Sequence, residues 1–117
     1  KIVIAGFSQG GAIALHNVLR ATQKPAGLMA LSTYLPLADT LQTEVVDNPA
    51  AGDTSVPVFM AHGSFDPVIP CEGGRQSAQA LEQIGYSVEW HEYPMAHGVC
   101  PQEIGDISAW LQRVYAG

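Results

Sequence analysis

Short apolar runs of strand length alternate along this chain with segments whose apolar side chains recur at helical spacing. The runs "KIVIA" at 1–5, "GLMALS" at 27–32 and "PVFMAHG" at 57–63 are continuous, which is typical of strands covered on both faces, and "SVEWHEYP" at 87–94 alternates. The intervening helices are predicted over 11–22, over 72–84 and from Pro101 onward. Strands joined by crossover helices form a parallel sheet with helices on both faces, so the predicted fold class is α/β.

The remaining segments complete a single small domain. Residues 33–56 are rich in Pro, Asp, Asn, Gly and Thr and are expected to be mostly loop, with one short helix near 36–41. The last helix is expected to bury one apolar stripe, made of Ile104, Ile107, Leu111 and Val114 with Trp110 beside them. A chain of 117 residues forms one domain at most. In such a parallel sheet, ligands collect at the carboxyl ends of the strands.

Charge and composition exclude several function classes. The chain carries 5 basic and 11 acidic residues, a formal net charge of −6, and the basic residues are scattered. This argues against nucleic-acid or anionic-membrane partners, which require clustered Lys and Arg. No apolar run approaches the length that spans a bilayer, and the four histidines lack a paired metal-ligand spacing. Cys71 and Cys100 are compatible with one disulfide, although two free thiols are favoured.

A serine between glycines follows the first predicted strand. Gly6-Phe7-Ser8-Gln9-Gly10 fits G-x-S-x-G between a strand and a helix, which is the context of a nucleophile elbow. A sharp turn there strains the serine backbone and requires neighbours without Cβ atoms. The turn also aims the Gln9 backbone N–H at a developing oxyanion. The alternative is a plain glycine-rich turn in which Ser8 caps the helix.

A nucleophilic serine needs a base, and the base needs an orienting acid. His97 follows the fourth predicted strand in "YPMAHGV" and is the expected base, whereas His16 and His91 lie within a helix and a strand. His62 sits in the same tight loop as the acid that follows it, so packing or loop bracing is its more natural role.

Asp66 follows the third predicted strand in "HGSFDPVIP" and is the expected acid. Its alternative role is that of a turn residue before Pro67. The other aspartates considered, for which solvated surface is the default, are Asp39, Asp47, Asp53 and Asp106. Serine, aspartate and histidine then follow each other in the chain order of the α/β hydrolases.

At these residues the chain resembles the phospholipase/carboxylesterase family of α/β-hydrolases, which includes acyl-protein thioesterases and small bacterial carboxylesterases. The matching blocks are "AGFSQGGAIALH", "ALSTYLP", "HGSFDPVIP" and "WHEYPMAHGV". The resemblance implies a catalytic triad of Ser8, Asp66 and His97 and one oxyanion donor at the Gln9 N–H. It also implies an acyl site lined by Leu35, Val68 and Met95, no cofactor, and a cytoplasmic location.

The resemblance further implies a carboxylesterase that cleaves esters of short to medium acyl chains through an acyl-enzyme. Acyl-protein thioesterase or lysophospholipase activity is the alternative within the family, and a catalytically incomplete fragment that serves as an interaction module is the alternative outside it. Family members carry strands and a second oxyanion donor before the elbow strand. The chain therefore resembles the C-terminal half of the fold, and the expected partners are the N-terminal half, or an equivalent chain, and an ester or thioester substrate. A homodimer is a further option.

Overall fold

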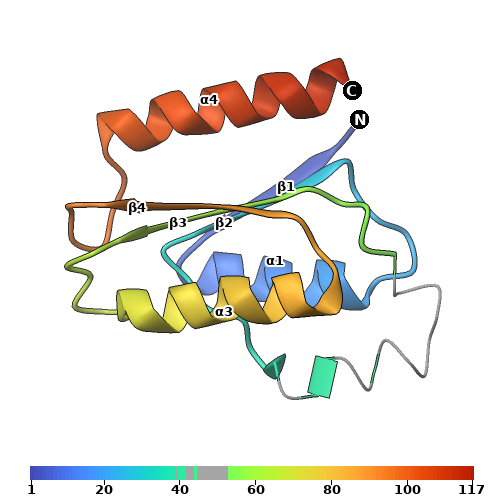
Figure 1. Ribbon diagram of the computed structural model, residues 1–117, viewed down its shortest axis with the longest axis horizontal. Coiled ribbons are helices and arrows are strands. Elements are labelled where there is room, and N and C mark those ends of the chain that lie inside the picture. Colours follow the sequence, from blue (N-terminus) through green and yellow to red (C-terminus); the bar gives the residue numbers. More distant parts are fainter. Residues whose placement is uncertain (39, 42–43, 45–52) are drawn as a thin grey trace.

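A computed structural model describes residues 1–38, 40–41, 44 and 53–117 of the protein (Figure 1). Its four strands are β1 (Val3–Phe7), β2 (Gly27–Leu31), β3 (Val58–Gly63) and β4 (Val88–Tyr93). They form one sheet in the order β1-β2-β3-β4, and every neighbouring pair is parallel. The predicted α/β class is therefore confirmed.

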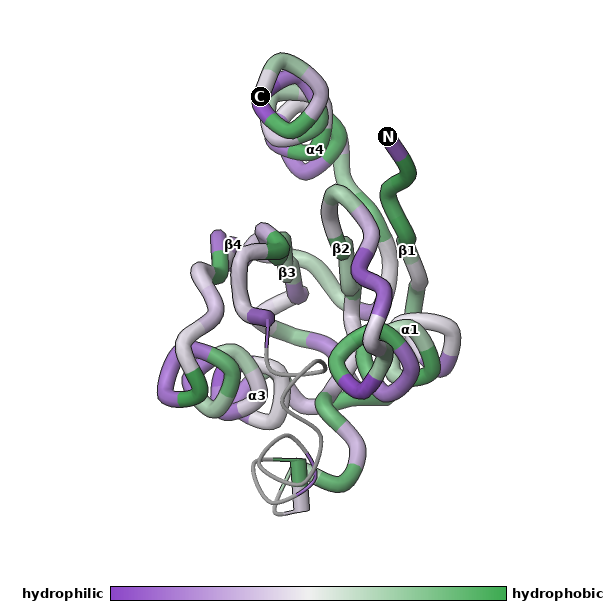
Figure 2. The backbone as a smooth tube through the Cα atoms, turned by 90° about the vertical axis from the view of Figure 1, so that its right-hand side faces the viewer, coloured by the Kyte–Doolittle hydropathy of each residue, from purple (hydrophilic) through white to green (hydrophobic). Residues whose placement is uncertain are grey.

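Helices cover both faces of this sheet. Helices α1 (Gln9–Arg20) and α3 (Cys71–Ile84) lie side by side on one face, and α4 (Pro101–Ala116) lies on the other (Figures 1 and 2). Helix α1 packs on β1 and β2, while α3 packs on β3 and β4. Of the short helix expected near 36–41, Ala38, Thr40 and Leu41 are helical, and Asp39 lies outside the described residues, as does Asp47.

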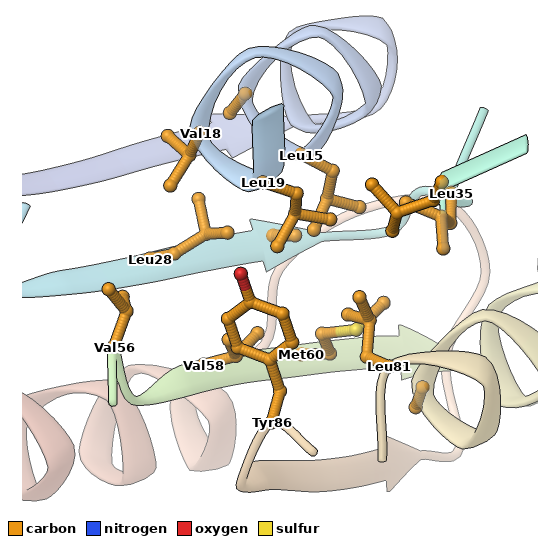
Figure 3. Packing of buried hydrophobic residues seen from close by; sticks show 14 residues of the cluster. Leu15, Val18, Leu19, Leu28, Leu35, Val56, Val58, Met60, Leu81 and Tyr86 are labelled. Carbon is orange, nitrogen blue, oxygen red and sulfur yellow. The ribbon is translucent and has the colours of Figure 1, made fainter. Parts of the chain in front are cut away.

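The larger core lies between the sheet and the helix pair. Successive side chains of a strand point to opposite faces, and on this face the central strands contribute Leu28 and Met60. They meet Leu15 and Leu19 from α1 and Leu81 from α3, all buried (Figure 3). The continuous apolar runs of β2 and β3 therefore reflect burial on both faces, as predicted for those two strands.

A smaller core lies under α4 on the opposite face. Trp110 is 3% exposed, and its ring centre lies 5.7 Å from that of Phe59 on β3. The same ring covers Gly27 of β2 so closely that a Cβ there would lie 2.8 Å from the Trp110 Cη2 atom. The absence of a side chain at Gly27 thus lets the indole approach the sheet.

Two burial predictions are wrong. The run at 1–5 was expected to be covered on both faces, but β1 is an edge strand of the described sheet, and Ile2 and Ile4 are 68% and 37% exposed. Figure 2 shows this apolar segment at the border of the sheet. Ile104 was expected in the buried stripe of α4 but is 59% exposed. The stripe is centred on Trp110, with Ile107, Leu111 and Val114 partly buried around it.

We expect Trp110 to anchor α4 to the sheet. Trp110→Ala should lower the free energy of unfolding by about 3–5 kcal/mol, because it removes a buried aromatic side chain and leaves a cavity. Ile104→Ala, on the exposed side of the same helix, should change it by less than about 0.5 kcal/mol. Urea unfolding of both variants measures the difference, and equal losses would contradict the assignment of these two residues to the buried and exposed sides of α4.

Candidate active site

Ser8 alone forms the turn between β1, which ends at Phe7, and α1, which begins at Gln9. Its backbone has φ 57° and ψ −122°, and positive φ is costly for a residue with a side chain. The turn is compact because Gly6 has no Cβ, since a Cβ there would lie 2.3 Å from the Gly10 carbonyl oxygen. The strain that the G-x-S-x-G pattern predicts is thus present at Ser8.

Two hydrogen bonds to the backbone of Ser8, one at its N–H and one at its carbonyl, stabilise the strained turn. The Ser8 N–H donates to the Leu31 carbonyl of β2 at 2.9 Å, and the Thr33 hydroxyl donates to the Ser8 carbonyl at 2.6 Å. The Thr33 methyl also contacts Gly11, where a Cβ would come within 2.7 Å of it. Sequence reasoning did not identify Thr33. Its position two residues beyond the end of β2, at the same sheet edge as Ser8, was the available signal.

The Ser8 hydroxyl points to His97 and not to its own helix. The distance from Ser8 Oγ to His97 Nε2 is 3.0 Å, and the Ser8 side chain makes no capping hydrogen bond among the described residues. The helix-cap alternative for Ser8 is therefore not the geometry found. The His97 ring also lies against Phe7, with ring centres 4.9 Å apart.

Asp66 uses its two carboxylate oxygens for different purposes. Oδ1 accepts hydrogen bonds from the backbone N–H groups of Val68 and Ile69, both at 2.8 Å, which is the turn role considered as its alternative. Oδ2 lies 2.7 Å from His97 Nδ1. Because a carboxylate only accepts, His97 Nδ1 carries the proton, and Nε2 is free to accept from the Ser8 hydroxyl.

The environment of Asp66 favours its ionised form. The side chain has no exposed surface, and this burial is the largest single influence and opposes ionisation. The hydrogen bonds from His97, Ile69 and Val68 together outweigh it and hold the pKa of Asp66 below its ordinary value. A buried, ionised acid therefore faces the imidazole of His97.

A cavity of about 470 Å³ opens beside Ser8, and Gln9 lines it together with Phe7, Gly10, Tyr34, Val68 and Ile69. Gln9 is the first residue of α1, so its backbone N–H has no acceptor within the helix. Of the three expected acyl-site residues, Val68 lines this cavity. Leu35 does not, because it is buried in the core beneath α1, and Met95 packs against the core under α4.

The other candidates from the sequence lie elsewhere. His91 Nε2 lies 2.8 Å from Glu89, Asp53 accepts from the Ser55 N–H, and Asp106 accepts from the Tyr93 hydroxyl. Cys71 and Cys100 are both free in the described structure. Within the described ranges, no group of three or more His, Cys, Asp or Glu side chains could hold a metal ion. None of the described helices is long and apolar enough to cross a membrane.

Comparison with known proteins assigns the family. The sequence profile of the family Phospholipase/Carboxylesterase matches residues 1–115. The chain belongs to this family. It is 41% identical over 114 residues to acyl-protein thioesterase 1 of Gibberella zeae. The aligned region covers 97% of this chain and 48% of that relative. The chain is 42% identical over 112 residues to acyl-protein thioesterase 1 of Neurospora crassa, covering 95% and 45%.

The fold of a solved family relative agrees with that of the chain. The crystal structure of Zea mays acyl-protein thioesterase 2 superimposes with a TM-score of 0.87 at 27% identity, over 94% of this chain and 54% of that protein. The chain spans about half the length of the curated relatives it matches. The family resemblance and the α/β-hydrolase fold predicted from the sequence are both confirmed.

We expect the elbow to tolerate a methyl group at Gly10 but not at Gly6. Gly6→Ala forces a Cβ into the Gly10 backbone and should lower both the melting temperature and the reactivity of Ser8. A Cβ at Gly10 meets nothing within 4 Å, so Gly10→Ala should leave the melting temperature unchanged or raise it. Calorimetry on the two variants tests this, and similar melting temperatures would contradict the close contact at Gly6.

We expect Asp66 to contribute acid sensitivity to folding. Because folding lowers the pKa of Asp66, its stabilising contribution is fully present above the ordinary value of about 3.9 and is lost as the pH falls through the lowered value. Asp66→Asn should therefore lose less stability than the wild type between about pH 5 and pH 2. Urea midpoints measured across this range check the prediction, and parallel curves for the two proteins would refute it.

Proposed function

We propose that the protein is a serine hydrolase that cleaves acyl thioesters through an acyl-enzyme. The observation that carries this proposal is the continuous hydrogen-bond chain from Ser8 Oγ to His97 Nε2, at 3.0 Å, and from His97 Nδ1 to Asp66 Oδ2, at 2.7 Å. Ser8 is the nucleophile, His97 the general base and acid, and Asp66 the group that fixes the imidazole tautomer.

In the first half of the reaction, Ser8 Oγ attacks the thioester carbonyl carbon while its proton moves to His97 Nε2. The buried Asp66 carboxylate stabilises the imidazolium that forms. Collapse of the tetrahedral intermediate breaks the carbon–sulfur bond, and the leaving sulfur takes the proton from His97. The acyl group is then bonded to Ser8 Oγ.

In the second half, His97 Nε2 takes a proton from water as the water attacks the acyl carbonyl. Collapse of this intermediate breaks the bond to Ser8 Oγ, which recovers a proton from His97, and the carboxylic acid leaves. The Gln9 backbone N–H, at the start of α1 and on the wall of the same cavity, is the donor we assign to the oxyanion in both halves.

The choice of thioesters is supported by the curated relatives, which are named acyl-protein thioesterases. The sequence alone placed carboxylic esters first and thioesters second, and the relatives favour the reverse order. The cavity lining is polar in its larger part, and Phe7, Tyr34, Val68 and Ile69 add apolar surface that an acyl chain of either kind of substrate would contact. A carboxylic ester of the same acyl chain is therefore the comparison that the test includes.

A partner segment for β1 and a cytoplasmic location stay predictions. Ile2 and Ile4 lie before and within β1, the edge strand of the described sheet, and are exposed; unpaired apolar strand edges tend to associate. A segment paired with this edge would lie next to Ser8 and is where we place the second oxyanion donor. Loss of one such donor costs about a hundred- to a thousandfold in turnover, so activity should rise when that segment is supplied.

We expect a fluorophosphonate probe to label Ser8, because a serine activated by histidine attacks phosphorus as it does a carbonyl carbon. Ser8→Ala should abolish labelling and lower kcat for an acyl thioester by roughly a millionfold. Ser64→Ala, an exposed serine on the neighbouring loop, is the matched control and should retain both.

Two outcomes would count against this proposal. Absence of labelling in the protein, alone and with the N-terminal part of the family domain added, would favour a non-catalytic interaction module. Labelling combined with a higher kcat/KM for the oxygen ester than for the thioester of the same acyl chain would support the serine hydrolase but return carboxylic esters to first place.

A further inference from the structure

His62 is a second histidine beside the acid of the proposed triad. It occupies the penultimate position of β3, and its side chain is 1% exposed. Its ring stacks on Trp90 of β4, with ring centres 6.2 Å apart. Gly74 of α3 lies beside both rings, and a Cβ there would come within 2.5 Å of His62 Nδ1 and 3.2 Å of Trp90 Cη2. The ring therefore fits this position only because residue 74 has no side chain.

The hydrogen bond of His62 fixes which nitrogen carries its proton. Nε2 lies 2.7 Å from the backbone carbonyl oxygen of Ile69. A carbonyl only accepts, so Nε2 is the protonated nitrogen and donates to Ile69. The same Nε2 lies 3.4 Å from Asp66 Oδ2, the oxygen that faces His97. The positive edge of the His62 ring is thus turned toward the Asp66 carboxylate.

This hydrogen bond anchors one side of the loop that carries Asp66. The side that enters the loop is tied to the β4 end by the N–H groups of Ser64 and Phe65, which donate to the carbonyls of Tyr93 and Met95. The side that leaves the loop is tied to β3 by His62 through Ile69. Because the Ile69 N–H also donates to Asp66 Oδ1, displacement of Ile69 moves the carboxylate with it.

Other charged groups near His62 already have partners. Glu92 is next to His62 in the β3–β4 register, but its Oε1 accepts from Arg75 of α3 and from the Trp90 indole N–H. The contacts of His62 Nε2 are with Ile69 and Asp66. His62 therefore interacts with the Asp66 loop and not with the ion pair of Glu92 and Arg75.

We propose that His62 is a positioning residue, which holds Asp66 Oδ2 in line with His97 Nδ1 by anchoring the Ile69 carbonyl to β3. This inference rests on the proposed function, because it gives His62 a role in the same triad. It does not make His62 a catalytic residue, since it contacts neither Ser8 nor the cavity beside it.

The first test compares two replacements of His62. His62→Met fills the space without a donor, and His62→Gln carries an amide N–H at about the reach of Nε2. We expect His62→Met to lower kcat by roughly a hundredfold with little change in KM, because a displacement of about 1 Å costs that much. His62→Gln should restore most of kcat. Equal kcat in all three proteins, or a loss that His62→Gln does not restore, would overturn the proposal.

The second test displaces the ring without replacing it and decides the question if His62→Met does not fold. Gly74→Ala pushes a Cβ to 2.5 Å from His62 Nδ1 and 3.2 Å from the Trp90 ring that stacks on it, whereas Gly73→Ala, one residue earlier in α3, meets nothing within 4 Å. Both changes add the same methyl group to the same helix. A fall in kcat for Gly74→Ala alone supports the proposal, and wild-type kcat in both variants overturns it.

A spectroscopic measurement separates this inference from the proposed function. The proton that His97 Nδ1 donates to Asp66 Oδ2 should give a downfield proton NMR signal in the wild type and in His62→Gln. The signal should move or disappear in Gly74→Ala but not in Gly73→Ala. An unchanged signal in Gly74→Ala would overturn the role of His62, whether or not Ser8 reacts with the probe.

Discussion

The four strands that the structure describes run in the same direction, and the position of the candidate active site depends on that constraint. In a parallel sheet, every strand ends at the same edge, so the segments that leave β1, β3 and β4 emerge together. Ser8, Asp66 and His97 come from these three exits and are separated by up to 89 positions in the chain. The parallel sheet therefore brings these three side chains together, and each one needs only a short loop after its strand to reach the common site.

Close backbone approach at the strand ends makes this meeting tight. A Cβ at Gly63, the last residue of β3, would lie 2.3 Å from the Met95 carbonyl and 2.2 Å from that of Ala96. The segment before His97 therefore rests directly on the end of β3, next to the loop of Asp66. Gly6 allows the equivalent contact at the elbow of Ser8. Glycines thus set the spacing between the three loops, and hydrogen bonds such as that of Thr33 fix their orientation.

The sequence predicted what depends on local pattern. The strand and helix order, the strain at Ser8 and the loops of Asp66 and His97 all follow from apolar periodicity, glycine spacing and position after a strand. Predictions that need the neighbours across space were less accurate. The apolar run of β1 resembles that of β3, yet Ile4 is exposed because no described strand lies beyond it. Tyr34 and Leu35 both come shortly after β2. Leu35 is buried in the core, whereas Tyr34 lines the cavity beside Ser8. The spacing of apolar residues in the sequence does not by itself show which of two adjacent residues faces a ligand.

The two carboxylate oxygens of Asp66 have different hydrogen-bond partners, and this has a consequence for an amide of the same shape at this position. The backbone N–H groups of Val68 and Ile69 require an oxygen at the Oδ1 position, so an amide placed there must turn its NH₂ group toward residue 97. That NH₂ is a donor, and His97 could meet it only with an unprotonated Nδ1, which moves the ring proton to Nε2. The imidazole would then present a hydrogen to the serine oxygen where it now presents a lone pair. The loop that buries Asp66 therefore also determines that His97 Nε2 accepts a hydrogen bond from the serine and does not donate one to it.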